Sequence, residues 1–276
     1  MGDQFLGQVY PVDSKVFSRR RKTRAHLVSS QRENEARIGK KNWLAEISCT
    51  VHAYSIRSST ICGMCAHYEA VSKPERLMSA FKVNMPQGAK VDVWPGFTGL
   101  FIRRPKEAIH AEGVAPWREA MPGSFGLIPH WAKDVSLAKR TYNARSETVA
   151  TKPSYRDAWR LGRRCIIPAE AFYEPDWRSG RAVPTRIARS DGKPMGIAGI
   201  WTGWRAPDGT IIRSMSMLTV NADDHPLMRN FHRPEDEKRM VVILDDADYD
   251  AWLNESNDSA SRLLVQFDPG RLVSVS

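Results

Sequence analysis

The thiols are the side chains of this chain best suited to covalent chemistry. There are four cysteines, Cys49, Cys62, Cys65 and Cys165, which are too few and too scattered for a disulfide framework. Cys62 and Cys65 form a C-x-x-C pair, but a zinc site needs two further close ligands and no second pair occurs. A free cysteine is commonly a small buried side chain, as we expect for Cys165 in its apolar run, so Cys65 needs partners before it is assigned a role.

Glu174 and His232 are the candidate acid–base groups. Glu174 lies in an aromatic-rich run, where the alternative is an exposed carboxylate at a strand end. His232 competes with His225, and we favour His232. The sequence contains no G-x-G-x-x-G after a strand, no P-loop and no H-E-x-x-H, so we expect neither a nucleotide cofactor nor a metal.

Composition narrows the class of protein. A hydrophobic share of 42% over 276 residues supports a packed core, and one domain is the simpler interpretation. The net charge of +10 favours a phosphate-bearing partner, either nucleic acid or an anionic membrane surface, over an uncommitted basic protein. No run of about 18 apolar residues could span a membrane, and the head lacks a signal-peptide core. We therefore expect a soluble cytoplasmic protein.

Residues 1–63 differ from the rest of the chain. They hold 11 Lys and Arg against 5 Asp and Glu, and the runs Ser18–Arg24 and Ser29–Asn34 show no helical or strand period. We expect little packed structure there. The segment is either a basic DNA-binding arm or an extension from a start codon assigned too far upstream, and we favour the second. The working domain would then be residues 64–276.

After Met64 the patterns predict an α+β domain. A capping box beginning at Ser72 predicts a helix to about Val83 with Leu77, Met78 and Phe81 on one face, and further helices are expected at 154–163 and from Asp246. Strands are expected at Gly99–Arg103, Phe125–Ile128, Cys165–Ile167, Gly196–Trp204, Ile211–Val220 and Met240–Leu244. Short strands among a few helices predict a single domain with a curved mixed or antiparallel sheet or open barrel.

Six segments in order carry a resemblance to a known family. They are Met64–Tyr68, Val93–Gly96, Phe125–Trp131, Tyr142–Thr148, Arg164–Glu174 and His232 ahead of Arg239–Leu244. Together they resemble the SOS-response-associated peptidase (SRAP) family. The resemblance implies removal of the initiator Met, a free N-terminal cysteine, and a thiazolidine link to abasic sites in single-stranded DNA. The site residues it implies are Cys65, Asn143, Glu174 and His232.

Two departures from the family pattern concern the site. Ala66 and His67 replace the usual Gly and Arg, which removes a phosphate contact that a mostly neutral His67 could replace only weakly. The segment 233–238 is longer than the family's usual link after the histidine. As numbered, Cys65 is internal and has no free amine.

An N-terminal cysteine suits capture of an aldehyde. An α-amine with a pKa near 8 is partly neutral at pH 7, so it attacks the ring-opened sugar better than lysine does, and its own thiol can then close a five-membered ring. Glu174 is our candidate for positioning the amine and exchanging its proton. His232 would donate a proton to the sugar oxygen, and Asn143 would orient the Cys65 backbone or the deoxyribose.

Expected DNA contacts surround this site. Arg145 and Arg239 are the candidate phosphate contacts, Trp131 and Trp94 the candidate stacking residues, and His67 a weak contact. The expected partner is single-stranded DNA with abasic sites. We expect a monomer. Its location would be the cytoplasm of a bacterial-type cell, with association to the nucleoid when it is bound to DNA.

Other functions remain open. Cys65 could attack the Met64–Cys65 bond and so expose its own amine. A thiol hydrolase acting on peptides in trans would use Cys65, His232 and Glu174 or Asn143 as a dispersed triad. A non-catalytic single-stranded DNA-binding protein would keep its DNA affinity after Cys65→Ala.

Overall fold

The computed structural model describes residues 66–88, 90–105 and 117–275. The strands are β1 His67–Ala70, β2 Asp92–Val93, β3 Thr98–Arg103, β4 Glu119–Phe125, β5 Asn143–Arg145, β6 Arg164–Asp176, β7 Val183–Arg189, β8 Met195–Arg205, β9 Ile211–Asn221, β10 Arg239–Val241, β11 Ile243–Leu244 and β12 Leu272–Val275. The helices are α2 Pro74–Phe81, α3 Arg156–Arg160, α4 Tyr249–Asn254 and α5 Asn257–Ser261, with 3₁₀ turns η1 Val135–Arg140, η2 Met228–Asn230, η3 Asp246–Asp248 and η4 Pro269–Arg271. No helix within these ranges has the length and apolarity that crossing a bilayer requires.

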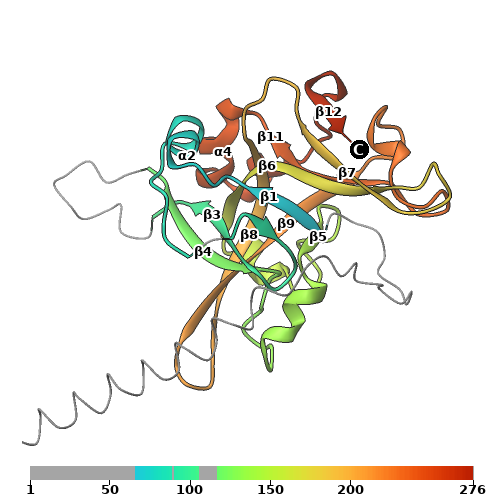
Figure 1. Ribbon diagram of the computed structural model, residues 1–276. Coiled ribbons are helices and arrows are strands. Elements are labelled where there is room, and N and C mark those ends of the chain that lie inside the picture. Colours follow the sequence, from blue (N-terminus) through green and yellow to red (C-terminus); the bar gives the residue numbers. More distant parts are fainter. Residues whose placement is uncertain (1–65, 89, 106–116, 276) are drawn as a thin grey trace, which may run out of the picture. The chain divides into compact units, whose positions relative to one another are not determined.

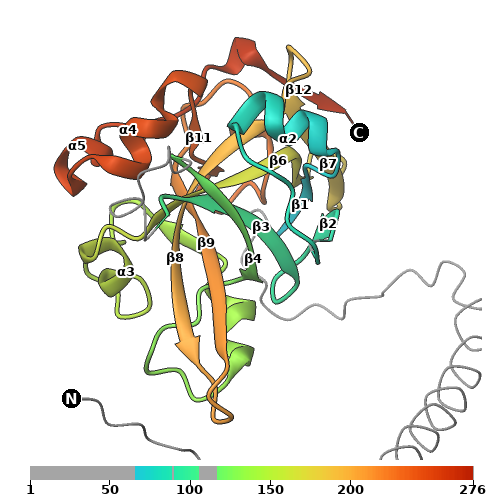
Figure 2. The same ribbon diagram turned by 90° about the vertical axis from the view of Figure 1, so that its left-hand side faces the viewer.

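The sheet closes on itself. Strands β8, β9, β4, β3 and β6 pair in that order, and β6 pairs back onto β8 from Arg164↔Ile200 to Ala169↔Met195. Among the strands that the structure describes, only β4 and β5 run parallel to their neighbour β9, so the sheet is mixed. Figures 1 and 2 show the long β8–β9 hairpin extending beyond the rest of the sheet. The expectation of a single α+β domain with a curved mixed sheet or barrel is confirmed, and the ring is closed rather than open.

Burial on both faces explains why β6 and β8 read as apolar runs. Their barrel-forming halves, Arg164–Ala169 and Met195–Trp201, contain no exposed residue, as expected for strands enclosed by other elements. Helix α4 covers β6, and the indole of its Trp252 donates to the Cys165 carbonyl at 2.8 Å. Cys165 is fully buried, as predicted, and burial raises the pKa of its thiol.

Three local predictions were wrong. The first helix has its N-cap at Lys73, not Ser72, and no side chain caps it; Pro74 forces the residue before it into an extended conformation, so Lys73 becomes the last residue outside the helix. Met78 is 42% exposed, so only Leu77 and Phe81 face the core. A strand was also expected at Phe125–Ile128, but β4 ends at Phe125.

The second half of β6 leaves the barrel and positions the candidate site. From Phe172 to Asp176 it pairs with β7 on one side, and up to Tyr173 it pairs with β1 on the other. The register sets His67 opposite Tyr173 and Glu174 opposite Thr185. A short strand from the start of the domain is thereby fixed beside the carboxylate-bearing end of β6.

Gly126 should be essential for stability because it turns the chain at the end of β4. Its φ is +118°, and an added Cβ would lie 1.9 Å from the Ala138 carbonyl oxygen. We expect Gly126→Ala to lower the free energy of unfolding by about 3 kcal/mol or more. Gly209→Ala is the control, since its φ is +87° with nothing within 4 Å of the added Cβ, and should cost about 1 kcal/mol. Equal losses in urea denaturation would contradict this account.

Candidate active site

Glu174 is a carboxylate held inside the protein. It lies on β6 between Tyr173 and Pro175, and only 1% of it is exposed. A carboxylate at such a position costs free energy unless charged or polar groups face it. The alternative of an exposed carboxylate at a strand end is therefore excluded by the geometry.

His232 is one group that faces this carboxylate. Its Nε2 lies 3.6 Å from Glu174 Oε2, beyond hydrogen-bond range, and 3.2 Å from the Arg239 carbonyl oxygen. Because a carbonyl only accepts, the hydrogen belongs on Nε2 and the lone pair on Nδ1. Nδ1 is buried and has no hydrogen-bond partner among the described residues. A substrate hydroxyl donating to Nδ1 would satisfy it.

The backbone of His232 is strained. Its φ is +62°, in the left-handed region that non-glycine residues rarely adopt, at a cost of about 1–3 kcal/mol. The strain is held by the His232 N–H, which donates to the Pro175 carbonyl at 2.9 Å, and by a bridge between Phe231 and Asp176. These contacts tie the histidine directly to the β6 segment that carries Glu174.

Asn143 begins β5, which lies parallel to β9 with Asn143 opposite Met217. It is buried, and its carbonyl accepts a 2.9 Å hydrogen bond from the Tyr155 hydroxyl. Burial raises the pKa of Tyr155 to about 12, so this phenol stays protonated and remains a donor at neutral pH. The backbone of Asn143 is thus fixed from both sides.

Arg239 links β5, β9 and His232. Although buried, its guanidinium donates to both oxygens of Glu147, to Glu237 at 2.8 Å and to the Thr219 carbonyl at 2.8 Å. Burial alone would lower the pKa of Arg239, but the two carboxylates outweigh it and the pKa is raised. Its own carbonyl accepts from His232, so the ion-pair cluster positions the histidine.

Arg145 shares one of these carboxylates. Its guanidinium lies 2.7 Å from the second oxygen of Glu237, and its side chain is 45% exposed. Of the two arginines predicted to contact DNA, Arg145 is therefore accessible and Arg239 is enclosed by protein groups. The longer segment 233–238 supplies this shared carboxylate.

An aromatic stack fixes the start of β1. The His67 ring lies between Trp94 and Tyr173, 4.2 Å from each ring centroid and within 15° of parallel. Its Nε2 is 3.3 Å from Asp92. Burial lowers the pKa of His67 despite that carboxylate, so the ring is neutral at pH 7 and offers no charge to a phosphate. Trp94 keeps 44% of its surface exposed.

The remaining predicted residues lie apart from this group. Trp131 is 48% exposed and donates to the Pro153 carbonyl at 3.4 Å. His225, the rejected alternative to His232, accepts from two backbone N–H groups through Nδ1 and contacts the Phe267 carbonyl through Nε2, which is a structural arrangement. Cys65, with the pair that it forms with Cys62, lies outside the described residues.

Sequence reasoning missed several supporting residues. Tyr155 holds Asn143, Glu147 holds Arg239 and Glu237 holds Arg145. Glu147 lies in the segment Tyr142–Thr148 but was given no role there, and Tyr155 and Glu237 lie outside the six segments. Among the residues that the structure describes, no three His, Cys, Asp or Glu side chains gather to hold a metal ion.

The chain is similar in sequence to a known protein family and to several curated proteins. A family model described as SOS response associated peptidase (SRAP) matches residues 64–275. Abasic site processing protein YoqW of Bacillus subtilis is 35% identical over 150 residues, covering 52% of this chain and 62% of that protein. Abasic site processing protein HMCES of Gallus gallus is 29% identical over 160 residues, covering 50% of this chain and 46% of that protein. The matched region therefore spans less than two thirds of these curated relatives.

Solved structures agree on the fold. A crystal structure of a Bordetella bronchiseptica protein is 44% identical and superimposes with a TM-score of 0.69, covering 76% of this chain and 98% of that chain. A protein from Bacteroides thetaiotaomicron, at 22% identity and a TM-score of 0.63, covers 76% of this chain and 90% of its own, and shares the fold.

The protonation state of His232 can be measured directly. Burial, which disfavours the imidazolium, lowers its pKa below the ordinary value of 6.5. As pH falls below about 6.5, His232 takes up a proton in the unfolded chain but not yet in the folded chain. This residue therefore makes the free energy of unfolding decrease toward acid pH. We expect His232→Asn, which tolerates a positive φ, to flatten the decrease in unfolding free energy between about pH 7 and pH 5. NMR titration of the ring should give a midpoint below 6.5; a higher one would contradict the assignment.

Proposed function

The chain belongs to the SOS response associated peptidase family, and we propose that it captures abasic sites in single-stranded DNA through a thiazolidine formed by Cys65 as an N-terminal residue. Relatives that are named abasic site processing proteins support the choice of an abasic site as the target. The observation that carries the chemistry is the buried pair of Glu174 and His232 at the β6 end that pairs with β1. One residue, Ala66, separates Cys65 from His67, so their Cα atoms lie at most about 7 Å apart.

Capture would proceed in two additions. The α-amine of Cys65 attacks the aldehyde carbon of the ring-opened sugar, and loss of water from the carbinolamine gives an imine. The thiol then adds its sulfur to the imine carbon and its proton to the nitrogen, which closes the thiazolidine. Glu174 can take the proton released by the amine and return it to the departing hydroxyl.

His232 would serve the sugar. Ring opening moves a proton from the C1 hydroxyl to the ring oxygen. A neutral imidazole with a lone pair on Nδ1 can accept the first proton and then donate it to the second oxygen. The low pKa of His232 suits this order, because the ring must be unprotonated before it accepts. The donors and acceptor of the Asn143 side chain would orient the deoxyribose or the Cys65 backbone.

The aromatic stack on His67 supports the same proposal. Fixing both faces of the ring restrains the first residues of β1, and hence the segment that leads to Cys65. A reactive group attached to a restrained strand loses less entropy when it meets its target. The stack would therefore position the nucleophile rather than bind phosphate.

Covalent capture can be tested on a denaturing gel. Protein beginning at Met64, with its N-terminal Cys65 verified by mass, is mixed with single-stranded DNA that carries one abasic site. We expect a heat-stable shifted band that is absent with Cys65→Ala. Glu174→Gln and His232→Asn should slow its formation by roughly 10²-fold or more. Glu75→Gln, an exposed carboxylate on α2, is the matched control and should react like wild type.

The same gel separates the alternative functions. Blocking the α-amine while sparing the thiol should abolish the band; a trans-acting thiol hydrolase would keep its peptidase activity after that treatment. No band from protein with a verified N-terminal Cys65 would exclude capture. Mass spectrometry of the full chain over time tests self-cleavage, which predicts a product that begins at Cys65.

The ion pair between Arg145 and Glu237 generates a prediction about DNA affinity. If Arg145 contacts phosphate, the phosphate must replace the Glu237 carboxylate, which now lies 2.7 Å away. Glu237→Gln should raise affinity for unmodified single-stranded DNA by up to about fivefold. It should also steepen the slope of the logarithm of the binding constant against the logarithm of salt concentration by about 0.7. The reason is that the phosphate then releases a counterion on binding instead of displacing the Glu237 carboxylate. Glu75→Gln controls for net charge, and equal effects of both variants would exclude Arg145 as a phosphate contact.

A further inference from the structure

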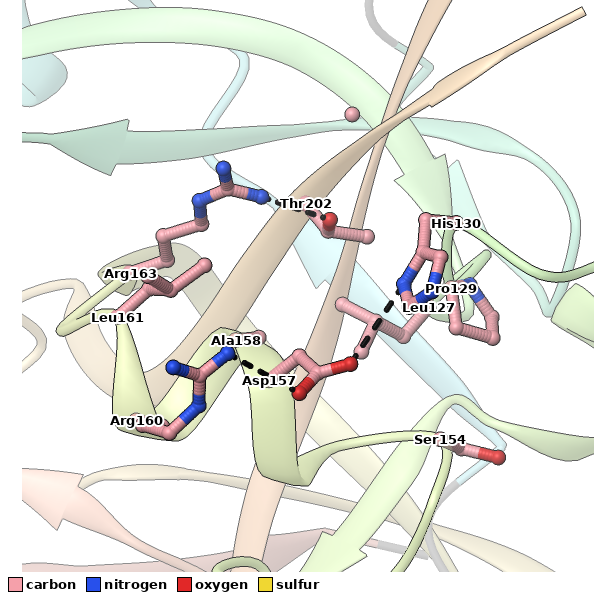
Figure 3. A pocket seen from close by; sticks show the side chains of 11 residues that line it. Leu127, Pro129, His130, Ser154, Asp157, Ala158, Arg160, Leu161, Arg163 and Thr202 are labelled. Carbon is pink, nitrogen blue, oxygen red and sulfur yellow. Dashed lines mark hydrogen bonds and ion pairs between the residues drawn. The ribbon is translucent and has the colours of Figure 1, made fainter.

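A pocket of 320 Å³ lies apart from the candidate active site and shares no residue with the Glu174–His232 group. Its walls come from three places: the segment after β4, helix α3 with its flanks, and β8 at Thr202 and Gly203. Figure 3 shows the side chains of Arg160, Arg163, Asp157 and His130 arranged around it. Its volume is at the low end for small-molecule sites, so it could take one nucleotide-sized group.

The polar groups of this pocket suit an anion. Arg160 and Arg163 are set against a single carboxylate, Asp157, and two hydroxyls come from Ser154 and Thr202. Arg163 is held in place by a 3.2 Å hydrogen bond to Thr202 and by the nearby Trp201 ring. A guanidinium has five N–H donors, so most of those on Arg163 remain for a ligand.

Asp157 engages its two nitrogen-bearing neighbours only weakly. Arg160 and His130 each approach it at 3.5 Å, the outer limit of a hydrogen bond, and their side chains are 72% and 71% exposed. Such exposed pairs contribute little stability, so both side chains can turn toward a phosphate at small cost. A phosphate would also offer Arg160 the shorter, bidentate geometry that guanidinium prefers.

The floor and rim of the pocket suit a nucleobase. Leu127, Pro129 and Leu161 supply apolar surface, and Trp131, next to His130, keeps 48% of its surface exposed. The Trp131 indole donates to the carbonyl of Pro153, which precedes Ser154 of the wall. An exposed indole at this place can stack a base while the arginines hold its phosphate.

Backbone hydrogen bonds join the pocket to the candidate active site. Leu127 in the floor pairs with Thr141, its N–H donating to the Thr141 carbonyl at 3.1 Å and its carbonyl accepting from the Thr141 hydroxyl at 2.6 Å. Thr141 lies two residues before Asn143. These hydrogen bonds therefore connect the pocket floor to the segment that leads into Asn143.

We propose that this pocket is a second nucleotide subsite, which binds the phosphate and base of a nucleotide flanking the lesion in single-stranded DNA. The inference rests on the proposed function for the identity of the strand. A free mononucleotide presents the same phosphate and base, so the experiment must separate the two sources.

The test uses the full chain with Cys65→Ala, so that only reversible binding is measured and failure of covalent capture would not affect it. Unmodified single-stranded oligonucleotides of increasing length are titrated against Arg160→Glu and Arg262→Glu. Arg262 is an exposed arginine after α5 and controls for the change in charge. We expect Arg160→Glu to weaken binding of the longer oligonucleotides roughly tenfold. The slope of the logarithm of their binding constant against the logarithm of salt concentration should become shallower by about 0.7 for each phosphate that is no longer bound. The shortest ones should be affected like the control.

Two results decide the assignment. NMR of the His130 ring should shift with long oligonucleotides; a shift with deoxynucleoside monophosphate as well would mean that the pocket accepts the free nucleotide. If Arg160→Glu matches Arg262→Glu at every length and the His130 resonance does not move with either ligand, the proposal is overturned. The covalent gel with intact Cys65 is read independently of these titrations.

Discussion

The pairing of β6 with β8 is the interaction on which the rest of the structure depends. It closes the barrel over the first half of β6 and leaves the second half free to pair elsewhere. That second half carries Glu174 and binds β1 and β7 at its edges. Since a slip of one residue in the β6–β8 register would turn Glu174 to the opposite face of the strand, the packing of the barrel fixes the geometry of the candidate site outside it.

The candidate site stores free energy that the scaffold must supply. A buried carboxylate, a buried neutral imidazole and a left-handed backbone at His232 are each unfavourable by themselves. They are held by hydrogen bonds to the Pro175 and Arg239 backbone, and Arg239 is held in turn by Glu147 and Glu237. Such a chain of supports is typical of sites that keep reactive groups in one geometry before the substrate arrives.

Much of the barrel could be predicted because its strands are long and apolar. The runs around β3, β8 and β9 and the helix carrying Tyr249 and Trp252 were placed within a few residues. The start of the first helix was misplaced by one residue, because the proline effect on Lys73 outweighed a good capping sequence at Ser72. Strand β7 went unpredicted, since Pro184, Thr185 and two arginines interrupt its apolar residues and leave no clear period of two.

The site was predicted as a set of residues but not as a geometry. Glu174 and His232 are 58 positions apart, and only the closed sheet brings them within 3.6 Å. Sequence position alone could not show that Arg239 is buried and Arg145 accessible, because that difference depends on which carboxylates fold over them. The family resemblance identified the types of the candidate site residues and their order in the chain. Their burial and their hydrogen-bond partners follow from the packing of the fold.

Charge distribution bears on how the domain would find its target. Residues 64–276 hold 30 Lys and Arg against 26 Asp and Glu, so any long-range attraction of this part of the chain to DNA would be weak. Arg145 and Arg239 are matched locally by Glu147 and Glu237. A phosphate would bind here only by exchanging with a carboxylate, which keeps affinity for undamaged strands low. Under the proposed function, selection of the lesion would then depend on its aldehyde and on the acid–base roles proposed for Glu174 and His232.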